Sequence, residues 1–140
     1  MTKNNKIELK VGVKILLKNK EGKYLILRRS ENKYPEVGSK WDIAGGRINI
    51  GETLIDNLKR EVVEETKLEI ISEPKLIYAQ DILKIEGKHI VRLTYIGNSN
   101  GEVILSEEHD EYKWVTLFEL ENMEPMDKYV KEIISKKLIQ

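Results

Sequence analysis

The sequence predicts one α/β domain of the α+β type, in which helices cover the faces of a mixed β-sheet. Two observations support this fold class. Apolar residues recur at every second position in some segments and at spacings of three and four in others, as expected for strands and helices respectively. The 140 residues contain no internal repeat and no linker rich in proline, glycine or serine, so we expect residues 1–140 to form a single domain.

The first predicted element is a β-hairpin. Apolar side chains alternate with other residues from Val11 to Leu17, which indicates a strand. Glu21 and Gly22 offer a turn, and residues 24–27 form the predicted returning strand. Residues 30–40 contain proline and glycine among polar residues, so we expect them to form a loop.

The central part of the chain changes from helical to strand periodicity. A helix is predicted over residues 52–66, because Ile55, Leu58 and Val62 form a single apolar stripe at helical spacing. Strands are predicted after it at 76–83, 89–96, 103–105 and 112–115. A strong turn is predicted at residues 98–101 (NSNG), between the second and third of these strands.

The last predicted element is a helix. Its apolar stripe consists of Tyr129, Val130, Ile133, Ile134 and Leu138. Asp127 precedes this stripe and is the expected N-terminal cap, because an aspartate side chain accepts hydrogen bonds from the first free N–H groups of a helix.

Composition excludes several classes of function. The 24 Lys and Arg residues balance 24 Asp and Glu residues, so no bulk charge favours a polymeric nucleic acid or an anionic membrane. No apolar run approaches the roughly 18 residues that a membrane span needs, and the N-terminal residues MTKNNKIELK do not resemble a signal peptide. The absence of cysteine excludes disulfides, thiolate metal sites and a cysteine nucleophile. We therefore expect a soluble cytoplasmic protein.

Three acids at the end of the predicted central helix require an explanation. Glu61, Glu64 and Glu65 share one side of the helix and border its apolar stripe. Their mutual repulsion and their position at the negative end of the helix dipole are both unfavourable, and Arg60 can offset part of this cost by pairing with Glu64. Two interpretations remain open from spacing alone: a solvated charged face, or a site for a hard divalent cation such as Mg²⁺.

The segment GGRINIGETLIDNLKREVVEETKL, residues 45–68, resembles the Nudix box, the signature of hydrolases that act on a nucleoside diphosphate linked to another group. The pattern is matched at Gly46, Glu52, Arg60, Glu61, Val62, Glu64, Glu65 and Leu68. Lys67 departs from it, because the family has a glycine there that permits a left-handed backbone after the helix. Lysine in that conformation would cost about 1 kcal/mol.

The resemblance implies a Nudix-like αβα sandwich and a metal-dependent reaction with Mg²⁺ or Mn²⁺. The implied metal ligands are the carbonyl of Gly45 and the carboxylates of Glu61, Glu64 and Glu65. A further carboxylate is expected from a later loop, where Glu108 is preferred over Glu107 and Glu111. Glu61 is the first candidate for the general base and Glu108 the second. Arg60 and Glu52 are the implied orienting groups, and His109 is expected to be a neighbour rather than a ligand.

The same resemblance implies a nucleotide substrate. Arg29 is the expected substrate contact at the end of the second strand, with Arg28 as the alternative; Gly46 would allow close approach of the ligand. Asp127 roughly matches a position that contacts the base in purine-specific members. The aromatic residues that could stack on a base, or serve packing instead, are Tyr34, Trp41, Tyr78 and Trp114.

The substrate itself is left open by the sequence. A nucleoside triphosphate, including an oxidised purine triphosphate, is favoured, because the chain is short for the additional N-terminal domain of many ADP-ribose hydrolases. ADP-ribose and dinucleoside polyphosphates remain alternatives. So does a non-catalytic nucleotide-sensing module, whereas isoprenoid diphosphate isomerases of this fold typically use a cysteine that this chain lacks. The expected assembly is a monomer or a homodimer.

Overall fold

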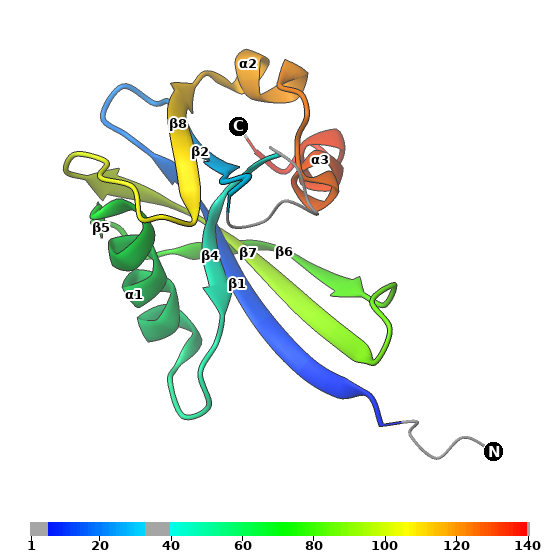
Figure 1. Cartoon of the computed structure of the whole chain (residues 1–140). Helices are drawn as coiled ribbons and strands as arrows, with labels where there is room; N and C mark the ends of the chain where they lie inside the picture. Colours follow the sequence, from blue (N-terminus) through cyan, green and yellow to red (C-terminus); the bar gives the residue numbers. More distant parts are fainter. Residues whose placement is uncertain (1–5, 33–39, 140) are drawn as a thin grey trace.

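The computed structural model describes residues 6–32 and 40–139, which form eight strands and three helices (Figure 1). Tyr34 and most of the predicted loop at 30–40 lie outside the described residues. The elements in chain order are β1 (Glu8–Lys18), β2 (Tyr24–Arg29), β3 (Trp41–Asp42), β4 (Ala44–Arg47), α1 (Leu54–Thr66), β5 (Glu69–Ile70), β6 (Lys75–Ile82), β7 (Lys88–Asn100), β8 (His109–Val115), α2 (Leu117–Asn122) and α3 (Lys128–Ser135).

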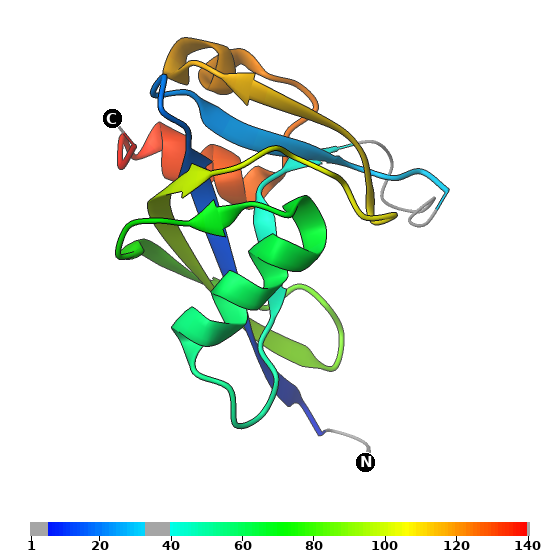
Figure 2. The ribbon, with the colours of Figure 1, turned by 90° about the vertical axis from the view of Figure 1, so that its left-hand side faces the viewer.

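The strands form the mixed sheet that the sequence predicts. β1 and β7 pair in parallel along their whole shared length, from Glu8 beside Lys88 to Lys18 beside Asn98. The remaining pairs are antiparallel: β2, β3 and β8 extend one side of β1, β4 also pairs with β1, and β5 and β6 pair with β7. Helix α1 covers one face and α2 and α3 cover the other (Figures 1 and 2), which confirms the predicted layered fold class.

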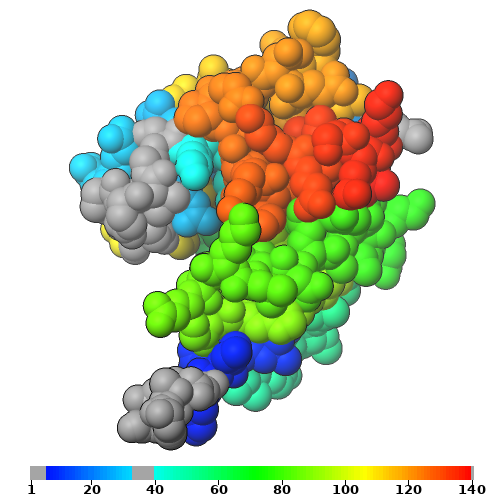
Figure 3. All heavy atoms as spheres, turned by 90° about the vertical axis from the view of Figure 1, so that its right-hand side faces the viewer, coloured from blue at the N-terminus to red at the C-terminus, as the bar shows by residue number. Residues whose placement is uncertain are grey.

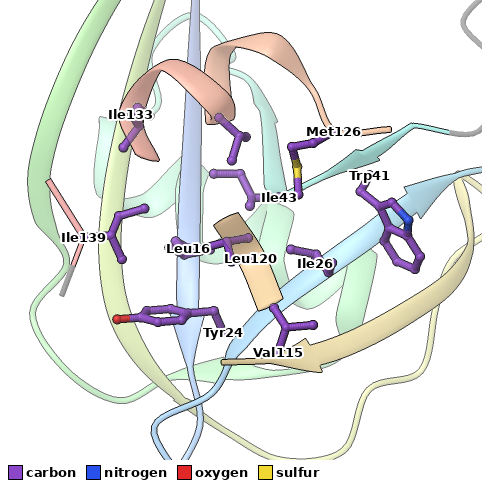
Figure 4. Packing of buried hydrophobic residues seen from close by; sticks show 11 residues of the cluster. Leu16, Tyr24, Ile26, Trp41, Ile43, Val115, Leu120, Met126, Ile133 and Ile139 are labelled. Carbon is purple, nitrogen blue, oxygen red and sulfur yellow. The ribbon is translucent and has the colours of Figure 1, made fainter. Parts of the chain in front are cut away.

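The alternation of side chains along β1 builds two separate cores. Val13, Ile15 and Leu17 pack toward α1, where they meet the helical stripe residues Leu58 and Val62. The second core lies on the other face, under α2 and α3 (Figure 4). Its buried residues are Leu16, Tyr24, Ile26, Trp41, Ile43, Val115, Leu120, Met126, Val130, Ile133 and Ile139. A strand buried on both faces needs apolar residues at odd and even positions, as β1 has.

Helix α1 begins and ends close to the predicted residues. Thr53 caps its N-terminus and accepts a hydrogen bond from the Asp56 N–H, so Glu52 precedes the helix instead of beginning it. At the other end, Lys67 adopts the left-handed conformation, with φ 63° and ψ 10°. The backbone geometry for which the family uses glycine is therefore kept, with a lysine in it.

Two local predictions after α1 are wrong. Residues 98–100 continue β7 instead of turning, because their backbone pairs with β1 and β5. The Ser99 hydroxyl also donates to the Lys18 carbonyl (3.3 Å). Residues 103–105 are not a strand: the Ile104 N–H donates to the carbonyl of Thr66 (2.9 Å), which ties this segment to the end of α1.

Several short elements escaped sequence analysis. β3, β4 and β5 have only two to four residues each, too few to show a period. Helix α2 has six residues and is stabilised by a capping box between Thr116 and Glu119. Asp127 caps α3 as predicted, but this helix ends at Ser135, so Leu138 lies beyond it and is exposed.

Figure 3 shows the face of the molecule to which α3 and the β6–β7 hairpin contribute. The segment from α2 to α3 (orange to red) forms the upper part, and β6 and the start of β7 (green) form the part below it. Within the described residues, no helix combines the length and apolar character required to cross a bilayer.

Candidate active site

A pocket of about 420 Å³ lies where α1, the sheet and the start of β8 meet. It has an acidic side, to which α1 and the loop before β8 contribute, and a basic side formed by strands. The lining residues are Gly12, Lys14, Arg29, Gly45, Gly46, Arg47, Glu65, Ile82, Ile90, Arg92, Glu108 and His109. Five of these were candidates from the sequence: Arg29, Gly45, Gly46, Glu65 and Glu108.

Glu65 is the most deeply buried acid of the pocket, with only 5% of its surface exposed. Its Oε1 atom accepts a hydrogen bond from the Gly45 N–H (3.1 Å). Burial raises the pKa of Glu65 to about 7; the nearby Lys14 charge and the Gly45 N–H oppose the shift, whereas Glu108 and Glu61 add to it. An acid with this pKa takes up or releases a proton near neutral pH.

Glu61 lies one helical turn before Glu65 and packs against Gly46. A β-carbon added at Gly46 would come within 2.5 Å of the Glu61 Oε2 atom, so only glycine leaves room for this carboxylate. Burial raises the pKa of Glu61, and the negative charges of Glu64 and Glu108 raise it further against the opposing effect of Arg60. Glu108 therefore acts electrostatically on both helix acids, the half-buried Glu61 and the buried Glu65.

Glu64 does not line the pocket, but it shares its partner Arg60 with Glu61, whose Oε2 atom lies 3.7 Å from Arg60 Nη2. The Glu64 carboxylate accepts hydrogen bonds from Arg60 Nη1 (3.1 and 3.2 Å), and more than half of its side chain is exposed. Arg60 also donates from Nε to both carboxylate oxygens of Glu52 (3.2 and 3.1 Å). The contact expected between Arg60 and Glu64 is thus present, and the structure separates Glu64 from the lining of the pocket.

Arg60 also belongs to a network that fixes the loop before α1. Its Nη2 atom donates to the side-chain oxygen of Asn57 (2.8 Å), a fully buried residue. The same oxygen accepts from the Asn49 N–H (2.9 Å), and the Asn57 amide donates to the Arg47 carbonyl (3.3 Å). Asn57 was missed in the sequence, although an asparagine beside the apolar stripe of a helix is a signal for such a buried anchor.

Of the three candidate loop acids, Glu108 is the one that lines the pocket. The Ser106 N–H donates to the Glu65 carbonyl (3.3 Å), and the Ser30 N–H donates to the Glu108 carbonyl (3.0 Å). These contacts hold Glu108 at the pocket, whereas Glu107 is exposed. Glu111 pairs instead with Arg28 (3.2 Å) on the outer surface.

The two candidate arginines are separated in the same way. Arg28 donates from Nε to Asp110 (2.8 Å) outside the pocket. Arg29, the next residue, lines the pocket and donates from Nη2 to Asp42 Oδ2 (3.4 Å). Of the two, Arg29 is thus the one placed to contact a ligand in the pocket.

The basic side of the pocket contains Lys14 and Arg92, which sequence analysis did not identify, beside the expected Arg29. We call Lys14, Arg29 and Arg92 the cationic cluster; all three line the pocket and all three pair with the buried Asp42. Burial alone would raise the pKa of Asp42, but the charges of its basic neighbours hold it well below the usual range. Lys14 could have been recognised from its place between the alternating apolar residues of β1, because a period of two puts its side chain on the opposite face of the strand.

His109 and Asp127 have surroundings that the sequence did not reveal. Burial, followed by the charges of Lys14 and Arg29, lowers the pKa of His109 to about 4, so its ring is neutral at pH 7. Asp127 Oδ1 accepts from the N–H groups of Tyr129 and Val130 and pairs with Arg92 (3.4 Å). Asp127 is thus a helix cap and an anchor for Arg92, and it does not line the pocket.

Three of the four candidate aromatic residues pack in or against the cores. Trp41 is buried in the core under α3, with Tyr78 against it, and Trp114 packs against the core under α1. Tyr34, the fourth candidate, lies outside the described residues.

The acidic side of the pocket fits a hard divalent cation by its chemistry. Glu65 and Glu108 line the pocket, and the carboxylate of Glu61 lies beside it against the lining residue Gly46, so all three offer oxygen donors. The charge of Glu108 raises the pKa of both Glu61 and Glu65, and the charge of Glu61 also raises the pKa of Glu65, a repulsion that a cation would relieve. Among the described residues, no three acidic or imidazole side chains already enclose a position for a metal. Phosphate oxygens and water would therefore have to complete the coordination, as is usual for Mg²⁺.

Comparisons with known proteins agree with this geometry. The NUDIX domain family matches residues 8–136. The chain is 30% identical to the RNA pyrophosphohydrolase of Bartonella bacilliformis, over 76% of each protein. Its fold is similar to the crystal structure of a MutT protein from Methanosarcina mazei Go1, with a TM-score of 0.80 and 31% identity over 93% of both chains.

A more distant structure shows the same fold. The MutT NUDIX hydrolase from Burkholderia pseudomallei has a TM-score of 0.77 and 21% identity, with 94% of this chain and 99% of that chain covered. Because the family match extends over nearly the whole chain, this protein belongs to the Nudix family of hydrolases, which act on pyrophosphate linkages.

Proposed function

We propose that this protein cleaves a diphosphate linkage in a nucleoside diphosphate linked to another group, using Mg²⁺ or Mn²⁺. The favoured substrate is a nucleoside triphosphate, including an oxidised purine triphosphate, which would give the monophosphate and diphosphate. The observation that carries the proposal is a single pocket with Glu65 and Glu108 on one side and Lys14, Arg29 and Arg92 on the other. A polyphosphate can satisfy both sides, because its oxygens pair with cations and complete metal coordination.

The proposed reaction is attack of water on a phosphorus atom. A new P–O bond forms, the bridging P–O bond breaks, and the bridging oxygen leaves with the departing phosphate group. The water proton passes to a carboxylate, for which Glu61 is the first candidate and Glu108 the second. A bound divalent cation would supply neutralisation of phosphate charge and acidify the attacking water.

The other residues have supporting roles in this proposal. Glu61, Glu65 and Glu108 would hold the cation, together with the Gly45 carbonyl. Glu64 could join them by exchanging its contact with Arg60, whose Nη1 atom now donates to both carboxylate oxygens of Glu64. Arg60 and Glu52 would keep the end of the loop and the helix acids in place.

The proposed organisation of the protein is simple. One catalytic domain over residues 1–140 acts in the cytoplasm as a monomer or homodimer. Because the net charge is zero, a small nucleotide would be attracted by the local cationic cluster alone.

The test is a panel of nucleotides assayed for phosphate or diphosphate release with Mg²⁺ and with EDTA. We expect metal-dependent release from at least one nucleoside triphosphate, and a loss of at least 100-fold for Glu61→Gln. Glu73→Gln, which changes an exposed loop acid outside the pocket, is the matched control and should retain activity. If no substrate of the panel, including ADP-ribose and a dinucleoside polyphosphate, is cleaved, the protein is a nucleotide-sensing module instead.

A second candidate substrate is the 5′-triphosphate end of RNA. It is favoured by the similarity to the RNA pyrophosphohydrolase, which covers 76% of this chain. It is opposed by the balanced charge of the chain, since binding to a polymeric backbone usually requires an excess of basic residues. Competition between a triphosphorylated RNA and a free nucleoside triphosphate decides between them: the favoured substrate has the higher kcat/KM.

A further inference from the structure

The carboxylate of Asp42 is the meeting point of the cationic cluster. Its Oδ2 atom lies 3.4 Å from both Lys14 Nζ on β1 and Arg29 Nη2 on β2. Its Oδ1 atom lies 3.3 Å from Arg92 Nη2 on β7 and accepts a hydrogen bond from the Ile43 N–H (2.7 Å). One side chain on the short strand β3 thus joins three other strands.

Asp42 stands behind the cationic cluster and not in the pocket. Only 2% of its surface is exposed, and it is not one of the residues that line the pocket, whereas its three basic partners are. A ligand in the pocket would therefore contact the partners and not Asp42 itself. Any effect of Asp42 on binding must act through their positions.

Two of the basic partners also have anchors of their own. Lys14 also donates to the Ile43 carbonyl (3.1 Å), next to Asp42. Arg92 also pairs with Asp127 (3.4 Å) and lies over the ring of Tyr129, with its guanidinium carbon 5.4 Å from the ring centre. Three like charges brought together repel one another, and the shared carboxylate of Asp42 counters this repulsion at all three of them when no ligand is bound.

We propose that Asp42 is a positioning residue, which holds the cationic cluster preformed for the phosphate groups of the substrate. This inference rests on the proposed function and identifies the part of the pocket that binds phosphate independently of metal. Preorganised cations bind more tightly than mobile ones, because less conformational entropy is lost when the ligand arrives.

For an Asp42 variant, the proposal predicts a change in phosphate affinity opposite to the change expected from net charge alone. Replacing Asp42 by asparagine removes a negative charge from the vicinity of an anion site, and this change alone would strengthen phosphate binding. If positioning dominates, the same substitution weakens binding, because the cluster spreads apart. The direction of the change therefore tests the idea.

The experiment measures binding of inorganic pyrophosphate by calorimetry in EDTA, so that it depends on neither metal nor hydrolysis. The native protein should bind pyrophosphate, and Asp42→Asn should raise the dissociation constant at least tenfold. In assays with a cleaved nucleotide, the same variant should raise KM more than it lowers kcat. Asp110→Asn is the matched control, because Asp110 pairs with Arg28 outside the pocket and its loss should leave binding unchanged.

A double-mutant cycle tests whether Asp42 acts through its partners. Arg29→Gln alone should weaken binding, and adding it to Asp42→Asn should cause less than the sum of the two effects. If the asparagine variant does not fold, Asp42→Glu takes its place; it keeps the buried charge but displaces the carboxylate, and should weaken binding several-fold.

Three results would overturn the inference: no pyrophosphate binding by the native protein, unchanged or tighter binding by a folded Asp42 variant, or fully additive effects in the cycle. None of them depends on catalysis. A native protein that binds pyrophosphate in EDTA but cleaves no nucleotide would instead contradict the proposed function and leave the positioning role supported.

Discussion

The side chain of Glu65 accepts a hydrogen bond from the backbone N–H of Gly45, which joins the last turn of α1 to strand β4. This contact places a buried carboxylate 20 residues along the chain from the glycine that it meets. The acidic side of the pocket therefore depends on the packing of α1 against β4. A substitution in either element is expected to disturb the position of the acids.

Glu65 should make the stability of the metal-free protein fall as pH rises. Its folded pKa is about 7, against 4.5 ordinarily, so between these values the folded protein retains a proton that the unfolded chain has released. The free energy of unfolding of the native protein minus that of Glu65→Gln should decrease by roughly 3 kcal/mol from pH 4.5 to pH 7 and stay constant above that. Urea unfolding in EDTA measures this difference.

The comparison with Glu65→Gln is needed because His109 contributes with the opposite sign. Its pKa is lowered from 6.5 to about 4, so stability rises between these pH values, equally in both proteins. A difference between native and variant that does not change with pH would contradict the raised pKa of Glu65.

Gly46→Ala should impair activity more than stability. The added methyl group would lie 2.5 Å from Glu61 Oε2, so the carboxylate must move away from its position in the site. We expect kcat to fall at least tenfold, while the melting temperature changes little because the end of a glutamate side chain can move. Gly12 lines the same pocket, but a β-carbon added there meets nothing closer than 3.8 Å, so Gly12→Ala should retain much more activity than Gly46→Ala. Equal activity of the two variants would exclude a positional role for Gly46.

Lys67→Gly should stabilise the protein. Lys67 has φ 63°, a conformation that costs most residues about 1 kcal/mol relative to glycine. We expect the free energy of unfolding to rise by about that amount, measured in denaturant, with activity unchanged. Lys136→Gly is the control, because φ is −85° at this helix end and no strain is relieved there. A loss of stability at position 67 would show that the lysine side chain outweighs its backbone strain.

Asn57→Ala should destabilise the protein by roughly 2–3 kcal/mol, because a fully buried side chain loses hydrogen bonds to Asn49, Arg47 and Arg60. Thermal or urea unfolding measures the loss. Asn122→Ala, which removes an exposed side chain with a bond to the Phe118 carbonyl, should cost under 1 kcal/mol. Similar losses in the two variants would mean that the loop before α1 does not depend on Asn57.

Mg²⁺ should stabilise the native protein more at pH 8 than at pH 5. The cation competes with protons for the buried acids, and Glu65 is protonated at the lower pH because its pKa is about 7. Thermal melting with and without MgCl₂ measures the shift, and Glu61→Gln should reduce it at pH 8. A shift that is equal at both pH values would contradict binding at these carboxylates.

Local patterns in the sequence determined much of the fold and part of the site. The period of β1 placed alternate residues on opposite faces, and the spacing of Glu61, Glu64 and Glu65 placed them on one side of a helix. Such relationships depend on the geometry of one element, which is the same in every protein. The Nudix box can likewise be read from one short stretch of the chain, residues 45–68.

Tertiary structure decided which candidates meet. It chose Glu108 from three loop acids and placed Arg29 but not Arg28 in the pocket. It also gathered the cationic cluster from three strands around Asp42 on a fourth. The repeating pattern within one helix or strand cannot predict the contacts of Asp42, because its three basic partners are 13 to 50 residues away in the chain. Only the register and curvature of the sheet bring them together.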